Sequence, residues 1–147
     1  MIRNTEGLKL PNFVQVLEDV PYEFHLIGSR MLACSHWLSD WDFCVQGDTG
    51  GYNRWGSPLE LALHKAGFSR ISIYSNRDKD INTIDVFERG WLPPSKMNII
   101  VVRDVELCVS AFNLVKQVPR LLNNRHSTPM WNKVYKALQM GEPILTP

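Results

Sequence analysis

Residues 25–46 of the chain read HLIGSRMLACSHWLSDWDFCVQ, and this stretch decides the expected fold. An apolar strand ends in Gly28-Ser29, where the missing side chain of the glycine lets another group approach the backbone closely. Ten residues later, Asp40 and Asp42 lead into a second apolar strand. Because side chains alternate along a strand, two residues separated by one share a face. The sequence therefore predicts two neighbouring carboxylates close to a glycine-serine turn.

This arrangement indicates a particular chemistry. Two carboxylates held side by side repel each other unless a cation lies between them, and Mg²⁺ takes oxygen ligands that are usually completed by substrate phosphates. The Gly-Ser turn supplies backbone N–H groups and a hydroxyl that can contact a phosphate. A lone Asp-x-Asp is most often solvated surface, and a lone Gly-Ser is most often an ordinary turn. The combination favours metal-assisted phosphoryl or nucleotidyl transfer.

The rest of the chain predicts a mixed α+β domain. The clearest boundary is at Ser57, an N-cap followed by Pro58 in the first turn and by Glu60 at the capping-box position. Helices are expected at 11–20, 57–67, 104–119 and 128–141, and strands at 22–27, 41–46, 70–75, 83–87 and 97–102. The order is αββαβββαα, a mixed sheet with packed helices. We expect residues 1–147 to form one domain, with C-terminal helices from about residue 104.

The composition of the chain excludes few classes of function. Sixteen Lys and Arg residues against fifteen Asp and Glu residues leave a net charge of +1, which neither demands nor excludes a nucleic-acid partner. The three cysteines have no paired metal-type spacing and fit reduced thiols of a cytoplasmic protein. No segment approaches a membrane span, so we expect a soluble protein without a membrane partner. No Walker-type phosphate loop and no Ser-His-Asp triad is indicated.

The joint pattern resembles the signature of the DNA polymerase β-like nucleotidyltransferase superfamily. The resemblance rests on Gly28-Ser29, the ten-residue gap and Asp40-Trp41-Asp42. It is strongest toward the minimal, stand-alone members of bacteria and their phages. The helix after Ser57 and the strands up to Val102 also follow the order of that family, so that roughly residues 20–118 are covered.

The resemblance implies a role for each motif residue. Gly28 and Ser29 would bind the triphosphate of a nucleoside triphosphate, and Asp40 and Asp42 would bind two Mg²⁺ or Mn²⁺ ions. The reaction would transfer a nucleoside monophosphate to an acceptor hydroxyl; similar proteins use partner proteins, transfer RNA and small hydroxylated compounds. Arg30, directly after the serine, could contact phosphate or form a surface ion pair.

The sequence departs from the family pattern at the third carboxylate. The family places that carboxylate on a later strand, and here the corresponding strand, residues 97–102, carries Asn98. An amide oxygen can bind a metal ion, but an amide brings no negative charge and cannot act as a base. Asp85, flanked by apolar residues on the preceding strand, is the other candidate for the site. Its alternative role is a polar residue on an exposed strand face.

Three outcomes follow from this departure, and the sequence leaves them open. Asp85 could replace the missing carboxylate, two carboxylates could suffice, or activity could be lost while nucleotide binding persists. The last outcome corresponds to a second hypothesis, a catalytically weak fold that acts as a nucleotide- or macromolecule-binding module. A nucleic-acid-binding domain is a third hypothesis, supported only by a modest basic excess after residue 110.

Overall fold

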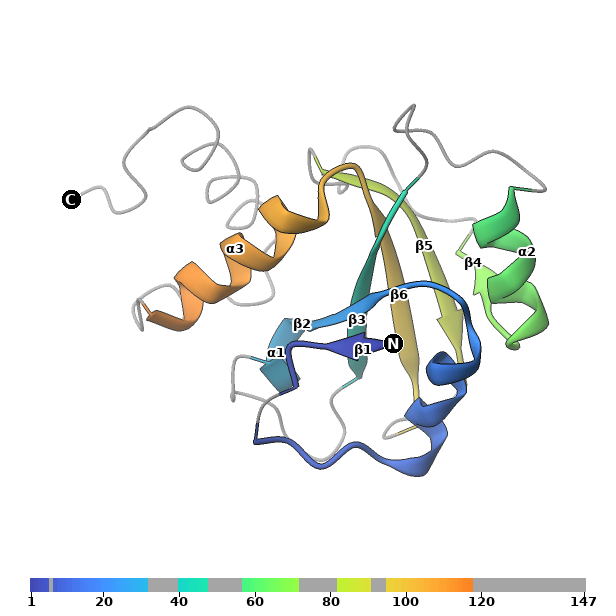
Figure 1. The fold of residues 1–147 in the computed structure, drawn as a ribbon, viewed down its shortest axis with the longest axis horizontal. Helices are drawn as coiled ribbons and strands as arrows, with labels where there is room; N and C mark the ends of the chain where they lie inside the picture. Colours follow the sequence, from blue (N-terminus) through green and yellow to red (C-terminus); the bar gives the residue numbers. More distant parts are fainter. Residues whose placement is uncertain (6, 32–39, 48–56, 72–81, 91–94, 118–147) are drawn as a thin grey trace.

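The computed structural model describes residues 1–5, 7–31, 40–47, 57–71, 82–90 and 95–117 (Figure 1). The described part is a mixed α+β fold with a six-stranded sheet. Its strands are β1 (Ile2–Arg3), β2 (Phe24–Ile27), β3 (Trp41–Gln46), β4 (Ser69–Arg70), β5 (Thr83–Arg89) and β6 (Met97–Val102). Its helices are the 3-10 helix η1 (Asn12–Asp19) and the α-helices α1 (Gly28–Met31), α2 (Pro58–Lys65) and α3 (Val105–Gln117).

The sheet has the strand order β1-β2-β3-β6-β5-β4. Strand β3 runs parallel to β6 and antiparallel to β2, and β5 runs antiparallel to both of its neighbours. The sheet is therefore mixed, as expected. The pairing of β3 with β6 brings together the two strands that carry Asp42 and Asn98, although 56 residues separate them in the chain.

The helices cover opposite faces of the sheet, with α2 on one side and α3 on the other (Figure 1). On the first face, His64 of α2 lies edge-on to the ring of Phe87, with 6.0 Å between the ring centroids. On the second face, Cys108 of α3 hydrogen-bonds with Cys44 of β3. This hydrogen bond and burial raise the pKa of the Cys44 thiol well above its usual value. Neither cysteine is in a disulfide, and both are buried.

Local signals explain the boundaries of α2. Ser57 has an extended backbone, and its hydroxyl oxygen accepts a hydrogen bond from the Glu60 N–H at 3.2 Å, as predicted for the N-cap. Pro58 occupies the first turn, and Gly67 follows the helix with a φ of +92°. The Glu60 carboxylate turns away from the cap toward Arg70 of β4.

The elements differ from the expected order in a few places. The segment expected to form the first helix is a 3-10 helix. The short elements β1 and α1 were not expected, because each contains too few residues to show a periodic pattern in the sequence. In the described part of the third expected strand, 70–75, the observed strand is limited to Ser69–Arg70. The helix expected at 128–141 and the cysteine at position 34 lie outside the described residues. No helix in the described ranges is long and apolar enough to cross a membrane.

Candidate functional site

Asp40 and Asp42 converge on one atom of Asn98. The amide Nδ2 of Asn98 donates hydrogen bonds to Asp42 Oδ1 at 2.9 Å and to Asp40 Oδ2 at 3.2 Å. Asp42 and Asn98 are paired in register across β3 and β6, and Asp40 is two residues before Asp42. The two carboxylates therefore share one face of the sheet, as strand alternation predicts. Asn98 lies at the position where the resemblance places a third carboxylate.

Gly28 brings the end of β2 against the same carboxylate. Ile27 pairs with Asp42 in the antiparallel register of β2 and β3, and Gly28 follows with a φ of +77°. A Cβ atom at position 28 would lie 2.4 Å from Asp42 Oδ2, which is closer than atoms can approach without a shift. A glycine is thus required twice, by the backbone conformation and by the neighbouring carboxylate. The expected proximity of the Gly-Ser turn to the aspartate pair is present.

The residues after Gly28 enter the short helix α1. Ser29 is its second residue, and Arg30 follows directly. The guanidinium carbon of Arg30 lies 4.8 Å from the centroid of the Trp41 ring, a cation–π contact. Trp41 alternates with Asp40 and Asp42 along the chain, so its ring, and the Arg30 guanidinium stacked on it, lie toward the opposite face from the two carboxylates.

The surroundings of Asp42 disfavour the ionised form of its carboxyl group. Burial raises the pKa of Asp42 from 3.8 to about 6. The hydrogen bond from Asn98 opposes this rise in the Asp42 pKa, the negative charge of Asp40 adds to it, and the positive charge of Lys96 opposes it. Burial and the negative charge of Asp40 are thus the two causes that favour the protonated form of Asp42.

The donor chemistry fits a hard divalent cation. Two carboxylates converge within hydrogen-bonding distance of one point, and oxygen donors of this type are the ligands that Mg²⁺ prefers. Among the described residues there is no group of three or more His, Cys, Asp and Glu side chains able to hold a metal ion. A cation at this point would have Asp40 and Asp42 as its carboxylate ligands, and Asn98 could join them only by presenting its amide oxygen in place of the Nδ2 that now faces them.

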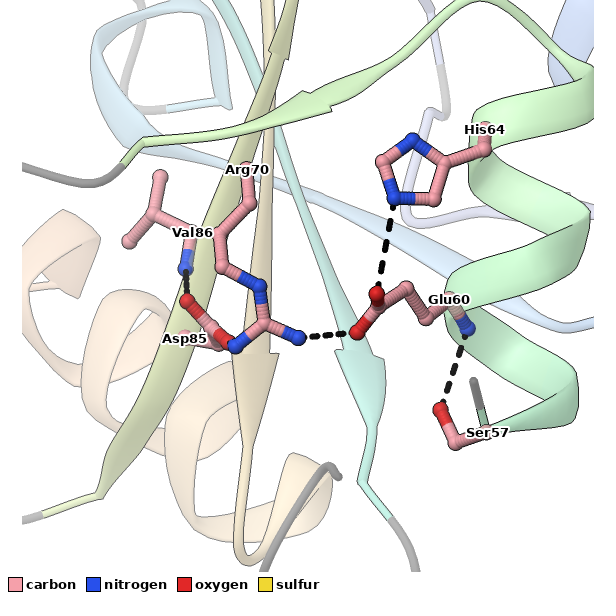
Figure 2. A network of polar contacts seen from close by, with 6 residues as sticks. All are labelled: Ser57, Glu60, His64, Arg70, Asp85 and Val86. Atoms are coloured by element: carbon pink, nitrogen blue, oxygen red, sulfur yellow. Dashed lines mark hydrogen bonds and ion pairs between the residues drawn. The ribbon is translucent and has the colours of Figure 1, made fainter. Parts of the chain in front are cut away.

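Asp85 is not brought to this site. It pairs with Val101 of β6, three residues beyond Asn98, and so its side chain lies on the opposite face of the sheet. There it forms an ion pair with Arg70 and accepts a hydrogen bond from the Val86 N–H at 3.0 Å (Figure 2).

Arg70 joins Asp85 to a second buried carboxylate. Figure 2 shows its guanidinium between the carboxylates of Asp85 on β5 and Glu60 on α2. Glu60 is 2% exposed and also lies 3.5 Å from Nε2 of His64. Arg70 sits over the Phe87 ring at 5.3 Å from the centroid. This cluster ties α2 to the sheet on the face away from the aspartate pair.

The sheet register adds a row of residues that sequence reasoning did not select. One residue from each of five neighbouring strands belongs to this row, in which each residue is paired with the next. In the strand order β2, β3, β6, β5 and β4, these residues are Ile27, Asp42, Asn98, Glu88 and Ser69. Glu88 is therefore next to Asn98 on the face of the aspartate pair, and Lys96 Nζ lies 3.4 Å from its carboxylate. The only sequence signal for Glu88 was its alternation with Val86, because the expected strand ended at Phe87.

Comparison with known proteins adds no information on the function of this site. No protein-family model matches the chain, and neither the curated proteins nor the solved structures include a significant match to it.

Proposed function

We propose that this protein is a nucleotidyltransferase of the DNA polymerase β-like kind, transferring a nucleoside monophosphate from a nucleoside triphosphate to a hydroxyl group. The observation that carries the proposal is the convergence of Asp40 and Asp42 on a single point, with Gly28 packed against one of them. A six-stranded mixed sheet that positions these groups at the ends of β2 and β3 supports a nucleotidyltransferase-type fold.

Each group has a role in the proposed reaction. The backbone of Gly28-Ser29 would bind the triphosphate, and Asp40 and Asp42 would hold Mg²⁺ or Mn²⁺. When bound, the two ions would neutralise the triphosphate and stabilise the departing pyrophosphate. The acceptor oxygen forms a bond with the α-phosphorus, and the bond from that phosphorus to the bridging oxygen breaks. Pyrophosphate leaves with the bonding electrons, and the hydroxyl proton passes to water.

Acceptor and location are also part of the proposal. A protein, a transfer RNA or a small hydroxylated compound would supply the hydroxyl. The buried thiols of Cys44 and Cys108, which form no disulfide, support a reaction in the cytoplasm.

The test combines binding and transfer. The purified protein is titrated with each nucleoside triphosphate in Mg²⁺ by calorimetry, and then incubated with α-labelled triphosphates and cell extract. We expect binding of at least one triphosphate, together with label on an acceptor. Asp40→Asn and Asp42→Asn should abolish both, whereas Asp19→Asn, at an exposed position of η1, should leave both unchanged. Equal binding by all four proteins would refute the proposal.

A nucleotide- or macromolecule-binding module without activity is the second candidate. The observation that favours it is the Asn98 amide, which replaces a third carboxylate and donates hydrogen bonds from Nδ2 to both remaining carboxylates. This candidate predicts triphosphate binding or partner binding without label transfer. For a module that engages another macromolecule, a change of Asp40 would leave that binding intact.

A further inference from the structure

A polar hollow lies beside the aspartate pair on the same face of the sheet. It has a volume of about 280 Å³ and is lined by Ser69, Glu88, Gly90 and Lys96. Glu88 pairs with Asn98 and Ser69 pairs with Glu88, so both belong to the row that contains Asp42. Lys96 is two residues before Asn98 and therefore shares its face.

The strand order places the hollow opposite the Gly-Ser turn. Gly28 ends β2 on one side of β3, whereas β6 and β5, which carry Asn98 and Glu88, lie on the other side. Neighbouring strands are about 4.8 Å apart, so Glu88 stands about 10 Å from Asp42 across the sheet. A triphosphate at Gly28 and a second substrate in the hollow would meet at the carboxylates.

The lining selects a neutral ligand rich in hydroxyl groups. The carboxylate of Glu88 and the ammonium of Lys96 are 3.4 Å apart and cancel each other's charge. Together with the Ser69 hydroxyl they offer hydrogen-bond acceptors and donors at neighbouring points. A hydroxyl group both donates and accepts, so adjacent hydroxyls of one ring match this lining. The hollow is large enough to admit one sugar ring.

We propose that this hollow binds the acceptor, and that the acceptor is a neutral polyhydroxylated compound such as a sugar or cyclitol. Glu88 accepts a hydrogen bond from the hydroxyl whose oxygen forms the bond with the α-phosphorus. The inference rests on the proposed function for the transfer step, but the binding of polyols does not require a nucleotide.

The test measures binding without nucleotide. The ¹⁵N-labelled full chain is titrated with myo-inositol, D-glucose and sorbitol, and with gluconate and glucosamine as charged counterparts, while amide shifts are followed by NMR. We expect a neutral polyol to shift the amides of Ser69, Glu88, Gly90 and Lys96, and to bind more tightly than either charged compound. Glu88→Gln should weaken this binding about tenfold, since a hydrogen bond to a charged group is lost. Ser69→Ala should weaken it less.

A matched control separates this effect from the loss of any surface ion pair. Glu23→Gln breaks the Arg3–Glu23 pair, whose atoms are 2.8 Å apart and whose side chains are half exposed, remote from the hollow in the strand order. It should leave polyol binding unchanged. The proposal is overturned if no polyol shifts the lining amides, if Glu88→Gln binds as the wild type does, or if transfer occurs only to a protein or RNA hydroxyl.

The two proposals fail in different ways. Asp40→Asn should lose Mg²⁺-nucleotide binding and keep polyol binding. Nucleotide binding without polyol binding would overturn only the acceptor site. Polyol binding in a protein that binds no nucleotide would overturn the proposed function instead.

Discussion

Gly28 leaves open the space that the carboxylate of Asp42 occupies. A Cβ atom at position 28 would be 2.4 Å from Asp42 Oδ2 and 3.1 Å from Asp42 Cβ. The positive φ of Gly28 adds a backbone requirement to this steric one. The end of β2 and the first residues of β3 are therefore coupled, and a change at either position acts on the other.

Gly28→Ala should displace the Asp42 carboxylate and lower Mg²⁺-nucleotide affinity by about tenfold or more, equivalent to about 1.4 kcal/mol or more. The strained backbone should also lower the free energy of unfolding by about 1–3 kcal/mol. Gly7→Ala is the matched control, because Gly7 has a φ of +76° but nothing within 4 Å of the added Cβ. It should cost stability and leave affinity unchanged. Calorimetry and urea unfolding measure the two quantities, and equal affinity losses in the two variants would contradict the coupling.

Asp42 should make the metal-free protein less stable as the pH rises. Its pKa is 3.8 in the unfolded chain and about 6 in the fold, so the folded state holds the proton more tightly. The resulting stabilisation is complete below the unfolded pKa and is lost as the pH passes through the folded pKa. The loss is at most about 3 kcal/mol, because each pKa unit corresponds to about 1.36 kcal/mol.

The Asp42→Asn variant removes this titration while nearly keeping the side-chain shape. Without divalent ions, it should be more stable than the wild type at about pH 8 and no more stable at about pH 4. Mg²⁺ should restore the wild type alone, since a cation favours the ionised carboxylate. Urea unfolding across this pH range tests the expectation, and parallel curves for the two proteins would show that Asp42 is not the titrating group.

Asn98→Asp should lower the stability of the metal-free protein and raise its affinity for Mg²⁺. The substitution removes the N–H donor shared by Asp40 and Asp42 and adds a third negative charge. We expect the metal-free protein to lose about 1–3 kcal/mol at neutral pH and to bind Mg²⁺ more tightly than the wild type. Asn98→Ala removes the donor without adding charge and should not gain affinity. Thermal unfolding with and without Mg²⁺ measures both effects; tighter binding by Asn98→Ala alone would contradict the expectation.

The Arg70 cluster should matter for stability and leave the aspartate pair unaffected. Arg70→Met strands the carboxylates of Glu60 and Asp85, which are 2% and 9% exposed, and should cost about 3–5 kcal/mol. Asp85→Asn should cost less and should keep Mg²⁺-nucleotide affinity within about twofold, since Asp85 lies on the other face. Asp40→Asn is the contrasting variant for affinity. A loss of affinity in Asp85→Asn equal to that in Asp40→Asn would show that Asp85 belongs to the site.

Several features were predictable because they depend on local chemistry. Ser57 caps α2 because its extended backbone places the hydroxyl oxygen at the Glu60 N–H. Asp40 and Asp42 share a face because the repeat of a strand is two residues. Asn98 could be placed beside them only with the help of a family resemblance in element order, because no local rule pairs β3 with β6.

By itself, the sequence determined the periods of α2, α3 and the longer strands, the cap of α2 and the two acids of one strand face. These features follow from bonds and side chains a few residues apart. The tertiary structure decided which strands are neighbours and in what register. That choice sent Asp85 to Arg70 on the far face and set Glu88 and Lys96 beside Asn98. Register depends on burying the apolar faces of the whole sheet at once. For that reason, no single segment carries the information that assembles the site.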